Sequence, residues 1–330
     1  MPVLTSPVRP APVTDHRAVR VGLDIGGTKI DGVALASGPG AGEVLAAARR
    51  ATPSGVADVV AAAAALVAEL VAGLVTAGPV DLEGIGVGIP GLVDPIAGTV
   101  RSAVNLGFGP DPVDLAGLLR RAVGGVPVVV ENDVNATAVG AHALLAPPGD
   151  LAVLSLGTGL AAGLVVGGEL LRGATGAAGE IGHLALDPGG HPCACGQRGC
   201  LETVAAGSAL QRDWPHGDEG RSAQHLFATA ATGDPAAVAV RDRWSAGVAL
   251  AVRTIALTCD PAVVVLAGGA AAVGEPVLRS VAAALQQQAR GSAFLRGLAL
   301  DQRLSLLPGD RPVAAVGAGQ AARVTSAGRP

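Results

Sequence analysis

The sequence is poor in aromatic residues: Phe, Trp and Tyr make up 2% of its 330 residues, and tyrosine is absent. Proteins that bind single-stranded nucleic acid stack bases on aromatic side chains, which argues against that class. The 23 Lys and Arg residues are scattered along the chain and the net charge is −4, so the sequence contains no basic cluster of the kind that binds DNA or an anionic membrane. The composition predicts a small-molecule partner, with no nucleic acid and no membrane.

Long apolar runs are also missing, since none reaches the roughly 18–20 residues that span a bilayer. The longest candidate, at 59–75, is interrupted by Glu69 and Gly73 and is rich in alanine, as is typical of a packed helix. The first twelve residues contain four prolines and lack the apolar core of a signal peptide. We expect residues 1–18 to be a disordered tail and the protein to be cytoplasmic.

Cysteine is scarce, yet three of the four cysteines lie within eight residues, inside HLALDPGGHPCACGQRGCLE (183–202). In a reducing cytosol, clustered cysteines are more often metal ligands than disulfides. The fourth, Cys259, stands alone at the end of an apolar helix, where we interpret it as a buried small hydrophobe.

The length favours two domains over one, because single cores stop growing near roughly 250–300 residues. LDIGGTKIDGVAL (23–35) aligns with LSLGTGLAAGLVV (154–166) at a constant offset of 131 residues, and each reads as strand, glycine-rich turn and strand. The pattern predicts two related α/β domains.

The periodicity also predicts the remaining elements. Strands are expected at 43–50, 83–90, 126–131 and 261–269, and helices at 56–77, 112–123, 132–145, 201–212, 221–231, 235–258, 274–290 and 311–324. A loop is expected from Pro90 to about residue 110.

Two glycine turns, GGTK (26–29) and GTGL (157–160), each follow a strand. Small residues let backbone N–H groups converge on an anion, and threonine adds a hydroxyl donor. One such turn is typical of an ordinary hairpin, whereas two at matched positions can hold one polyphosphate between domains. The spacing of a P-loop is absent.

A carboxylate, Asp133, stands just past a buried strand in ENDVN (131–135). It has two interpretations: a helix cap, a role that Asn132 can fill by itself, or a group that takes a proton from a hydroxyl attacking phosphorus.

These motifs together resemble the ROK family (repressors, open reading frames and sugar kinases) of the actin-like ATPase superfamily, and within it the bacterial ATP-dependent glucokinases. The resemblance covers residues 20–325. It rests on LDIGGTK (23–29), GIGVGIPGLVD (84–94), ENDVNATAVGAH (131–142), LGTGLAAGLVVGGELLRGATGAAGEIGH (156–183), CACGQRGCLE (193–202) and LAGG (266–269). AGEIGH followed by nine residues and CxCGxxGCxE is close to diagnostic.

The resemblance implies an actin-like (ribonuclease H-like) fold of two related α/β domains with a cleft between them. The smaller N-terminal domain would comprise residues 19–134 and 312–326. The larger C-terminal domain would comprise residues 135–311, including a zinc loop at 183–202.

It also implies a structural zinc site with His183, Cys193, Cys195 and Cys200 as ligands. The chemistry agrees, because one imidazole and three thiolates complete a closed tetrahedral shell, and glycines at 196 and 199 let the backbone wrap around it. His191 is the rival fourth ligand.

For catalysis, the resemblance implies that Asp133 is the base and that Asp24 helps to place the magnesium of Mg-ATP. Residues facing the phosphates would be Gly26, Gly27, Thr28, Lys29, Gly157, Thr158 and Gly159, with Gly268 and Gly269 on the adenosine side. Sugar contacts would come from Asn105, Asn132, Asp133, Glu180, His183 and Glu202.

Two of these acids have a plainer interpretation. Glu202 fits a first-turn helix acid favoured by the dipole, and Glu180 fits a solvated charge in a glycine-rich loop. In addition, NLGF (105–108) replaces the Asn-Leu-Pro-Gly-Trp type of sequence found in family glucokinases. That departure bears on which hexose is bound.

We therefore predict transfer of the γ-phosphoryl group of ATP to a hexose, first of all O6 of glucose, by a homodimer or homotetramer. The alternatives are a kinase for N-acetylglucosamine, N-acetylmannosamine or fructose, and a sugar-sensing regulator. About eighteen residues precede Val19, too few for a winged helix-turn-helix of some seventy residues. Retention of Asp24 and Asp133 argues against a catalytically dead sensor, and the cysteine loop argues against a polyphosphate-dependent kinase.

Overall fold

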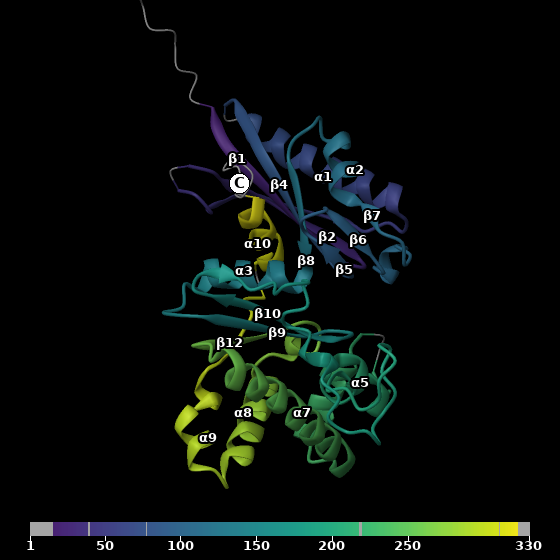
Figure 1. The fold of residues 1–330 in the computed structure, drawn as a ribbon, viewed down its shortest axis with the longest axis vertical. Coiled ribbons are helices and arrows are strands. Elements are labelled where there is room, and N and C mark those ends of the chain that lie inside the picture. The colour runs from purple at the N-terminus through teal and green to yellow at the C-terminus, as the bar shows by residue number, and fades with distance from the viewer. Residues whose placement is uncertain (1–15, 39, 77, 218–219, 310, 323–330) are drawn as a thin grey trace, which may run out of the picture.

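Two five-stranded sheets with helices between and outside them form the body of the computed structural model (Figure 1). The structure describes residues 16–38, 40–76, 78–217, 220–309 and 311–322. Most of the expected N-terminal tail, residues 1–15, lies outside this range. Its last residues do not belong to a tail, because Arg17 and Ala18 already form the start of the first strand.

The first sheet has the order β3-β2-β1-β4-β8 and the second the order β11-β10-β9-β12-β13. The first comprises β1 (Arg17–Ile25), β2 (Lys29–Ala36), β3 (Val44–Ala51), β4 (Val80–Ile89) and β8 (Val128–Asn132). The second comprises β9 (Leu151–Leu156), β10 (Leu160–Val166), β11 (Glu169–Leu170), β12 (Val263–Ala267) and β13 (Leu304–Leu306). In both sheets, as ordered above, the first three strands pair antiparallel with one another. The fourth strand pairs in parallel with the third, and the fifth pairs in parallel with the fourth. This shared topology confirms the duplication predicted from the sequence.

The two hairpins differ in register by one residue. Ile25 pairs with Ile30 around the first turn, whereas Leu156 pairs with Leu160 around the second. The second turn is therefore one residue shorter, although the two sequences align without a gap.

Each sheet has its own core on its outer face. Helices α1 (Val56–Val75) and α2 (Leu115–Ala122) pack on the first sheet. The second core includes α4 (Glu202–Ala205), α5 (Gly207–Asp213), α6 (Ser222–Ala231), α7 (Pro235–Cys259) and α8 (Glu275–Ala289). By length and composition α1 alone, among the described helices, could cross a membrane. Its buried residues include Val59, Leu66 and Leu70, which pack in the core of the first sheet.

Helices α3 (Asp133–Leu145) and α10 (Val313–Ala321) lie between the two sheets (Figure 1). They touch through backbone: a Cβ placed on Gly140 would lie 1.9 Å from the oxygen of Val313, and one on Gly317 would lie 1.8 Å from the oxygen of Ala136. Only glycine fits such a close approach. Helix α10 is packed in the same way against Gly22 of the first sheet.

Several short elements were missed by the sequence patterns. The expected loop from Pro90 holds β5 (Leu92–Asp94), β6 (Thr99–Arg101) and a 3₁₀ turn at Val104–Leu106. With β7 (Val113–Asp114) these strands form a third sheet. Strands β11 and β13 and helix α9 (Ala293–Leu298) were not expected either. The helix expected at 201–212 is broken, because Ala206 is extended and Gly207 donates its N–H to the oxygen of Gly157 at 2.8 Å.

Candidate active site and cysteine cluster

Two carboxylates meet where the parallel strands of the first sheet end. Asp24 pairs with Gly88 across β1 and β4, and Gly88 pairs with Glu131 across β4 and β8. Asp133 follows β8 directly and begins α3, which can approach because Gly88 has no side chain: a Cβ there would lie 3.8 Å from the Cα of Asp133. The carboxyl ends of neighbouring parallel strands thus place both acids at one edge, the usual location of a ligand site in such sheets.

Both acids have raised pKa values. Burial, followed by the charges of Asp133 and Asp31, raises the pKa of Asp24 to about 7, and Lys29 opposes this rise. Burial also raises the pKa of Asp133, against a hydrogen bond from the N–H of Val134. Adjacent carboxyl groups whose pKa values lie above the ordinary range are typical of sites that bind a divalent cation or accept a proton near neutral pH.

Asn132, and not Asp133, caps α3. Its Oδ1 accepts hydrogen bonds from the N–H groups of Val134 at 2.9 Å and of Asn135 at 3.4 Å, while its Nδ2 donates to the oxygen of Gly91 at 3.4 Å. Asp133 uses only Oδ1, toward Val134 at 3.0 Å. Within the described chain its Oδ2 has no protein partner, so this oxygen is available to a substrate.

The first glycine turn is held by Thr52 of the segment after β3. Its Oγ1 donates to the oxygen of Gly26 at 2.7 Å, and its N–H donates to the oxygen of Thr28 at 3.1 Å. The turn itself is exposed over residues 27–29. Asn105, expected to contact the sugar, lies against it, since a Cβ on Gly27 would be 3.3 Å from that of Asn105.

Lys29, expected to face the phosphates, is already paired. Its Nζ lies 3.1 Å from Oδ2 of Asp31, which also forms an ion pair with Arg49 of β3. Asp31 and Arg49 were not identified from the sequence.

The second glycine turn contacts the expected adenosine-side residues. Gly268 has φ +87°, and a Cβ there would lie 2.8 Å from the nitrogen of Gly157. The next residue but one, Ala270, donates to the oxygen of Leu156 at 3.0 Å. The structure therefore brings Gly157–Gly159 and Gly268–Gly269 together, while Thr158 at the tip stays exposed.

The cysteine cluster is assembled as the sequence predicted. One ligand atom from each of His183, Cys193, Cys195 and Cys200 lies within 4.8 Å of the others. The Sγ atoms of Cys195 and Cys200 are 3.7 Å apart, and Sγ of Cys193 is 3.7 Å from Nδ1 of His183. Atoms about 2.3 Å from a tetrahedral centre lie about 3.8 Å apart, whereas disulfide sulfurs lie about 2.05 Å apart. The spacing fits a metal and not a disulfide.

The thiols of the cluster differ in pKa, because hydrogen bonds from the backbone and side chain of Gln197 lower the pKa of Cys195 to about 6. Burial, with the neighbouring thiol groups of Cys195 and Cys193, raises the pKa of Cys200 to about 12. A divalent metal removes this penalty, because it binds thiolates. His191, the rival ligand, is not among the four converging residues, and Cys259 is half-buried against the core of the second sheet.

The two ring nitrogens of His183 face different neighbours, one inside the cysteine cluster and one outside it. Nδ1 faces Cys193, while Nε2 lies 3.8 Å from Oε2 of Glu180. Glu202 is likewise shared: its Oε1 contacts the sulfur of Cys193 at 3.7 Å and its Oε2 accepts from the N–H of Leu160 at 3.0 Å. Glu202 is therefore tied to the second glycine turn, and its role exceeds that of a first-turn acid.

Phe108 does not line the site. It is 2% exposed and belongs to the core of the first sheet. The departure at NLGF therefore places no aromatic ring at the expected hexose site.

Two residues beside Asp133 were missed from the sequence. Glu131 and Asn135 are 4% and 9% exposed and hydrogen bond to each other at 3.0 Å, and Glu131 also pairs with Arg172. The one available signal was a charged residue ending an apolar strand.

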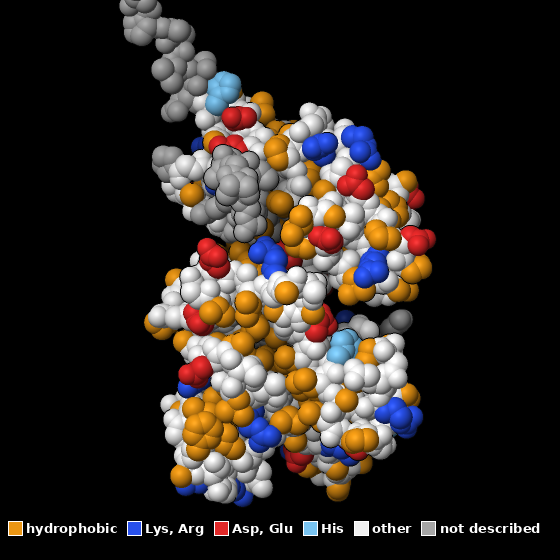
Figure 2. Space-filling model, viewed as in Figure 1, with side chains coloured by type: hydrophobic (Ala, Val, Ile, Leu, Met, Phe, Trp, Pro, Cys, Tyr) orange, Lys and Arg blue, Asp and Glu red, His pale blue; other side chains and the backbone are white. Residues whose placement is uncertain are grey.

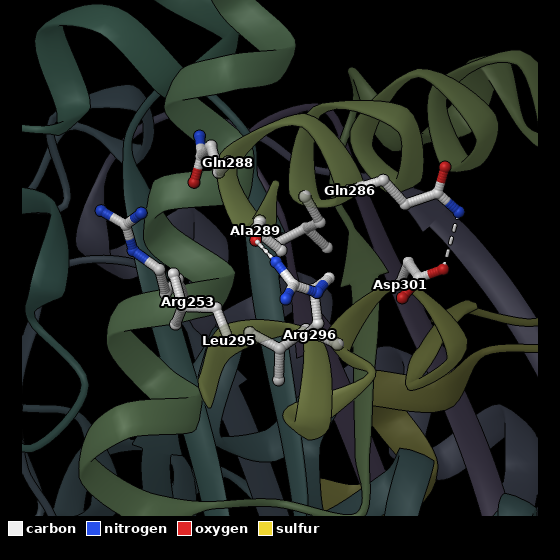
Figure 3. Close-up of a pocket in the computed structure, with 9 residues that line it drawn as sticks. Arg253, Gln286, Gln288, Ala289, Leu295, Arg296 and Asp301 are labelled. Atoms are coloured by element: carbon white, nitrogen blue, oxygen red, sulfur yellow. Dashed lines mark hydrogen bonds between the residues drawn. The ribbon is translucent and has the colours of Figure 1, made fainter. Parts of the chain in front are cut away.

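Figure 2 shows the surface hollowed between the upper lobe, which carries β5–β7, and the lower lobe, which carries α5. Two further cavities lie elsewhere. A small one of about 170 Å³ lies between α7, α8 and α9, where Arg296 donates to backbone oxygens at the end of α8 and Gln286 donates to Asp301 (Figure 3). A larger groove of about 980 Å³ runs between α6, α7 and α8. None of the expected site residues lines either.

Known proteins are similar to this chain in sequence and in structure. A glucokinase of Thermotoga maritima is 34% identical over 276 residues, which are 77% of this chain and 83% of that protein. The crystal structure of a ROK hexokinase from Thermus thermophilus has a TM-score of 0.75 at 32% identity, covering 92% of this chain and 97% of the other. A ROK glucokinase from Streptomyces griseus, solved in complex with glucose and AMPPNP, has a TM-score of 0.71 at 30% identity, covering 92% and 99%.

These likenesses confirm the expected actin-like architecture of two related α/β halves. The sequence model of the ROK family matches residues 20–296. With most of its length matched in this way, the chain belongs to the ROK family.

Proposed function

We propose that this protein transfers the γ-phosphoryl group of ATP to O6 of glucose. The observation that carries the proposal is the pair Asp24 and Asp133 at the strand ends, with one glycine turn directly after Asp24 and a matched turn in the second sheet. Relatives that share this architecture are named glucokinases or hexokinases, and one of them was solved with glucose and an ATP analogue.

In this mechanism Asp133 accepts the proton of the hexose hydroxyl as its oxygen attacks phosphorus. Its position suits the task because Asn132 carries out the capping and leaves Oδ2 of Asp133 free. Its raised pKa also brings it nearer to neutral pH, where a general base is most effective.

Asp24 would hold the magnesium of Mg-ATP, directly or through water. Magnesium neutralises the phosphate charge when it is bound. Glycine backbone N–H groups from both turns would face the phosphates, and Lys29 would exchange its partner Asp31 for a phosphate oxygen. The charges that stabilise the transferred group thus come from the first sheet.

The cysteine cluster would hold a structural zinc ion that orients the hexose site. With His183 ligated through Nδ1, its Nε2 and the neighbouring Glu180 remain free to bind sugar hydroxyls. A metal-bound imidazole has a fixed tautomer and ring orientation, so these contacts become rigid. Glu202 joins the cluster to the second turn and completes the set.

We further infer that the enzyme works in the cytoplasm in hexose metabolism, as a homodimer or homotetramer that binds neither nucleic acid nor membrane. Light scattering at assay concentrations measures the assembly state directly.

The proposal is tested by a coupled ADP-release assay with ATP and a panel of hexoses: glucose, mannose, fructose, N-acetylglucosamine and N-acetylmannosamine. We expect the highest kcat/KM with glucose and a product phosphorylated at O6 by NMR. A preference for N-acetylmannosamine would replace glucose within the same mechanism. Absence of ADP release with every hexose would refute the kinase assignment.

A further inference from the structure

An ion pair joins the strand of the catalytic acid to the loop of the hexose site. Glu131 ends β8 of the first sheet and is 4% exposed, while Arg172 follows β11 of the second sheet. Nε of Arg172 lies 2.7 Å from Oε2 of Glu131. The pair therefore bridges the two halves of the molecule next to Asp133.

The other carboxylate oxygen of Glu131 accepts two hydrogen bonds. Oε1 accepts hydrogen bonds from the N–H of Asn132 and from Nδ2 of Asn135, both at 3.0 Å. These two residues flank Asp133 in the first turn of α3. Glu131 thus fixes the backbone N–H just before the proton acceptor and the side chain of Asn135 just after it.

Arg172 is fixed at its other end to the loop that carries Glu180. Its backbone oxygen accepts from the N–H of Ala178 at 3.2 Å, and the next residue, Gly179, has its oxygen bound to the N–H of Ala162 at 2.8 Å. Glu180 follows immediately. One side chain therefore links this loop to the end of β8.

We propose that Arg172 and Glu131 are positioning residues, which hold Asp133 and the hexose-contacting loop in register across the boundary between the two halves. The inference rests on the function proposed above. A guanidinium suits the task because its planar donors fix the direction of approach to a carboxylate, which a lysine ammonium does not. Neither residue touches the reacting atoms.

The test compares R172M with R303M, a matched control. Arg303 makes an ion pair with Asp260 at 2.6 Å within the second half, far from the site. For R172M we expect kcat to fall roughly 10–100-fold and KM for the hexose to rise, with KM for ATP within about twofold, as for losses of groups that orient a site. R303M should keep all three values.

Hydrogen exchange measures the coupling without any substrate. In R172M, peptides covering 131–135 and 171–183 should both lose protection, while those of the second core should not. Unchanged exchange in both segments, or an R172M enzyme with unaltered kcat, would overturn the proposal. If wild-type protein phosphorylates no hexose, the proposed function fails and the exchange result still decides whether the pair couples the segments.

Two milder variants guard against misfolding of R172M. E131Q keeps the shape of the side chain and one acceptor oxygen but replaces the other oxygen with an amide NH2 and loses the charge. R172K keeps the charge and loses the planar fork. We expect each to lose less activity than R172M, and guanidinium ion added to R172A should restore part of its kcat. Equal kcat in R172K and wild type would show that only charge matters and would contradict the positioning role.

Discussion

The two sheets have the same strand order and the same connections, yet their first hairpins carry different side chains. At the offset of 131 residues, Asp24 corresponds to Ser155, and Lys29 corresponds to Leu160. The first hairpin is charged, with Asp24 directly opposite Asp31, and the second is neutral. The second half carries the cysteine cluster instead.

This difference teaches which parts of such a site come from the backbone and which come from side chains. Glycine turns arise from the hairpin topology, so a duplicated fold supplies them twice. Carboxylates depend on single residues, and of the two matched hairpins only the first, whose strand end converges with α3, carries them. The following experiments test that division.

The largest effect is expected at Asp133. Replacing it in D133N keeps the size and removes the proton acceptor, which typically costs on the order of 10²–10⁴-fold in rate. Turnover should fall far more than hexose affinity, measured by calorimetry. D81N, at an exposed position at the other end of the neighbouring strand β4, is the control. Near-normal kcat in D133N would contradict the assignment.

The matched pair D24N and S155A compares equivalent positions of the two hairpins. D24N should lower kcat/KM for Mg-ATP by roughly 10²–10³-fold, because it removes the negative charge that places the cation. S155A should change it by less than about twofold. Similar losses in both variants would show that the two halves share the phosphate chemistry.

The cysteine cluster belongs to the second half alone, and C195A removes one of its ligands. We expect C195A to lose about one zinc ion per chain by elemental analysis and to bind hexose roughly 10–100-fold more weakly, with ATP affinity little changed. C259A, outside the cluster, should keep both zinc and affinity. A metal-free wild-type enzyme with full activity would rule out the role of zinc.

The pKa of Asp24, about 7 in the folded protein against 3.8 ordinarily, makes stability depend on pH. Between these values the unfolded chain releases a proton that the folded chain retains, so Asp24 destabilises the ligand-free protein as pH rises from 4 to 7. The difference between a pKa of 3.8 and one of about 7 corresponds to about 4 kcal/mol in the free energy of unfolding. Because Asp24 is partly exposed to solvent, we expect a contribution of about 2 kcal/mol. In urea unfolding, the free energy of unfolding of D24N should increase relative to that of wild type as the pH rises to 7. A constant difference would place the titration elsewhere.

Two glycines that align in sequence, Gly32 of β2 and Gly163 of β10, should differ in their tolerance of a side chain. A Cβ on Gly163 would lie 2.6 Å from the backbone oxygen of Val134, whereas one on Gly32 meets side-chain methyls of Leu66 and Leu70 at 3.0 Å. Backbone cannot move aside as leucine methyls can. G163A should therefore cost about 1–2 kcal/mol in urea unfolding and G32A about 0.5 kcal/mol. Equal costs would indicate that α3 yields as easily as α1.

Long elements were predictable because their patterns repeat over many residues. Helices α1, α3, α6, α7 and α8 begin and end within about two residues of the predicted positions, since glycine, proline or a capping residue marks their ends. The sheet β5–β6–β7 was missed because strands of two or three residues contain no measurable period. The break at Ala206 depends on a contact with Gly157, which spacing does not reveal.

The parts of the candidate site that lie within short sequence motifs were predictable. The converging His and Cys residues and the pairing of Asp24 with Asp133 follow from short segments that resemble those of the family. The ion pair of Glu131 with Arg172 joins residues 41 positions apart, and neither segment alone identifies its partner. Phe108 shows the opposite case, where a visible change in a motif lies in the core.

The glycine contacts of α3 and α10 have a mechanical consequence. Helices normally pack with the side-chain ridges of one helix in the grooves of the other. Where Gly140 meets Val313 and Gly317 meets Ala136, the two backbones are in direct contact, with no side chain between them. A single methyl group added at Gly140 or Gly317 would therefore push α3 away from α10, and with them the two sheets between which they lie.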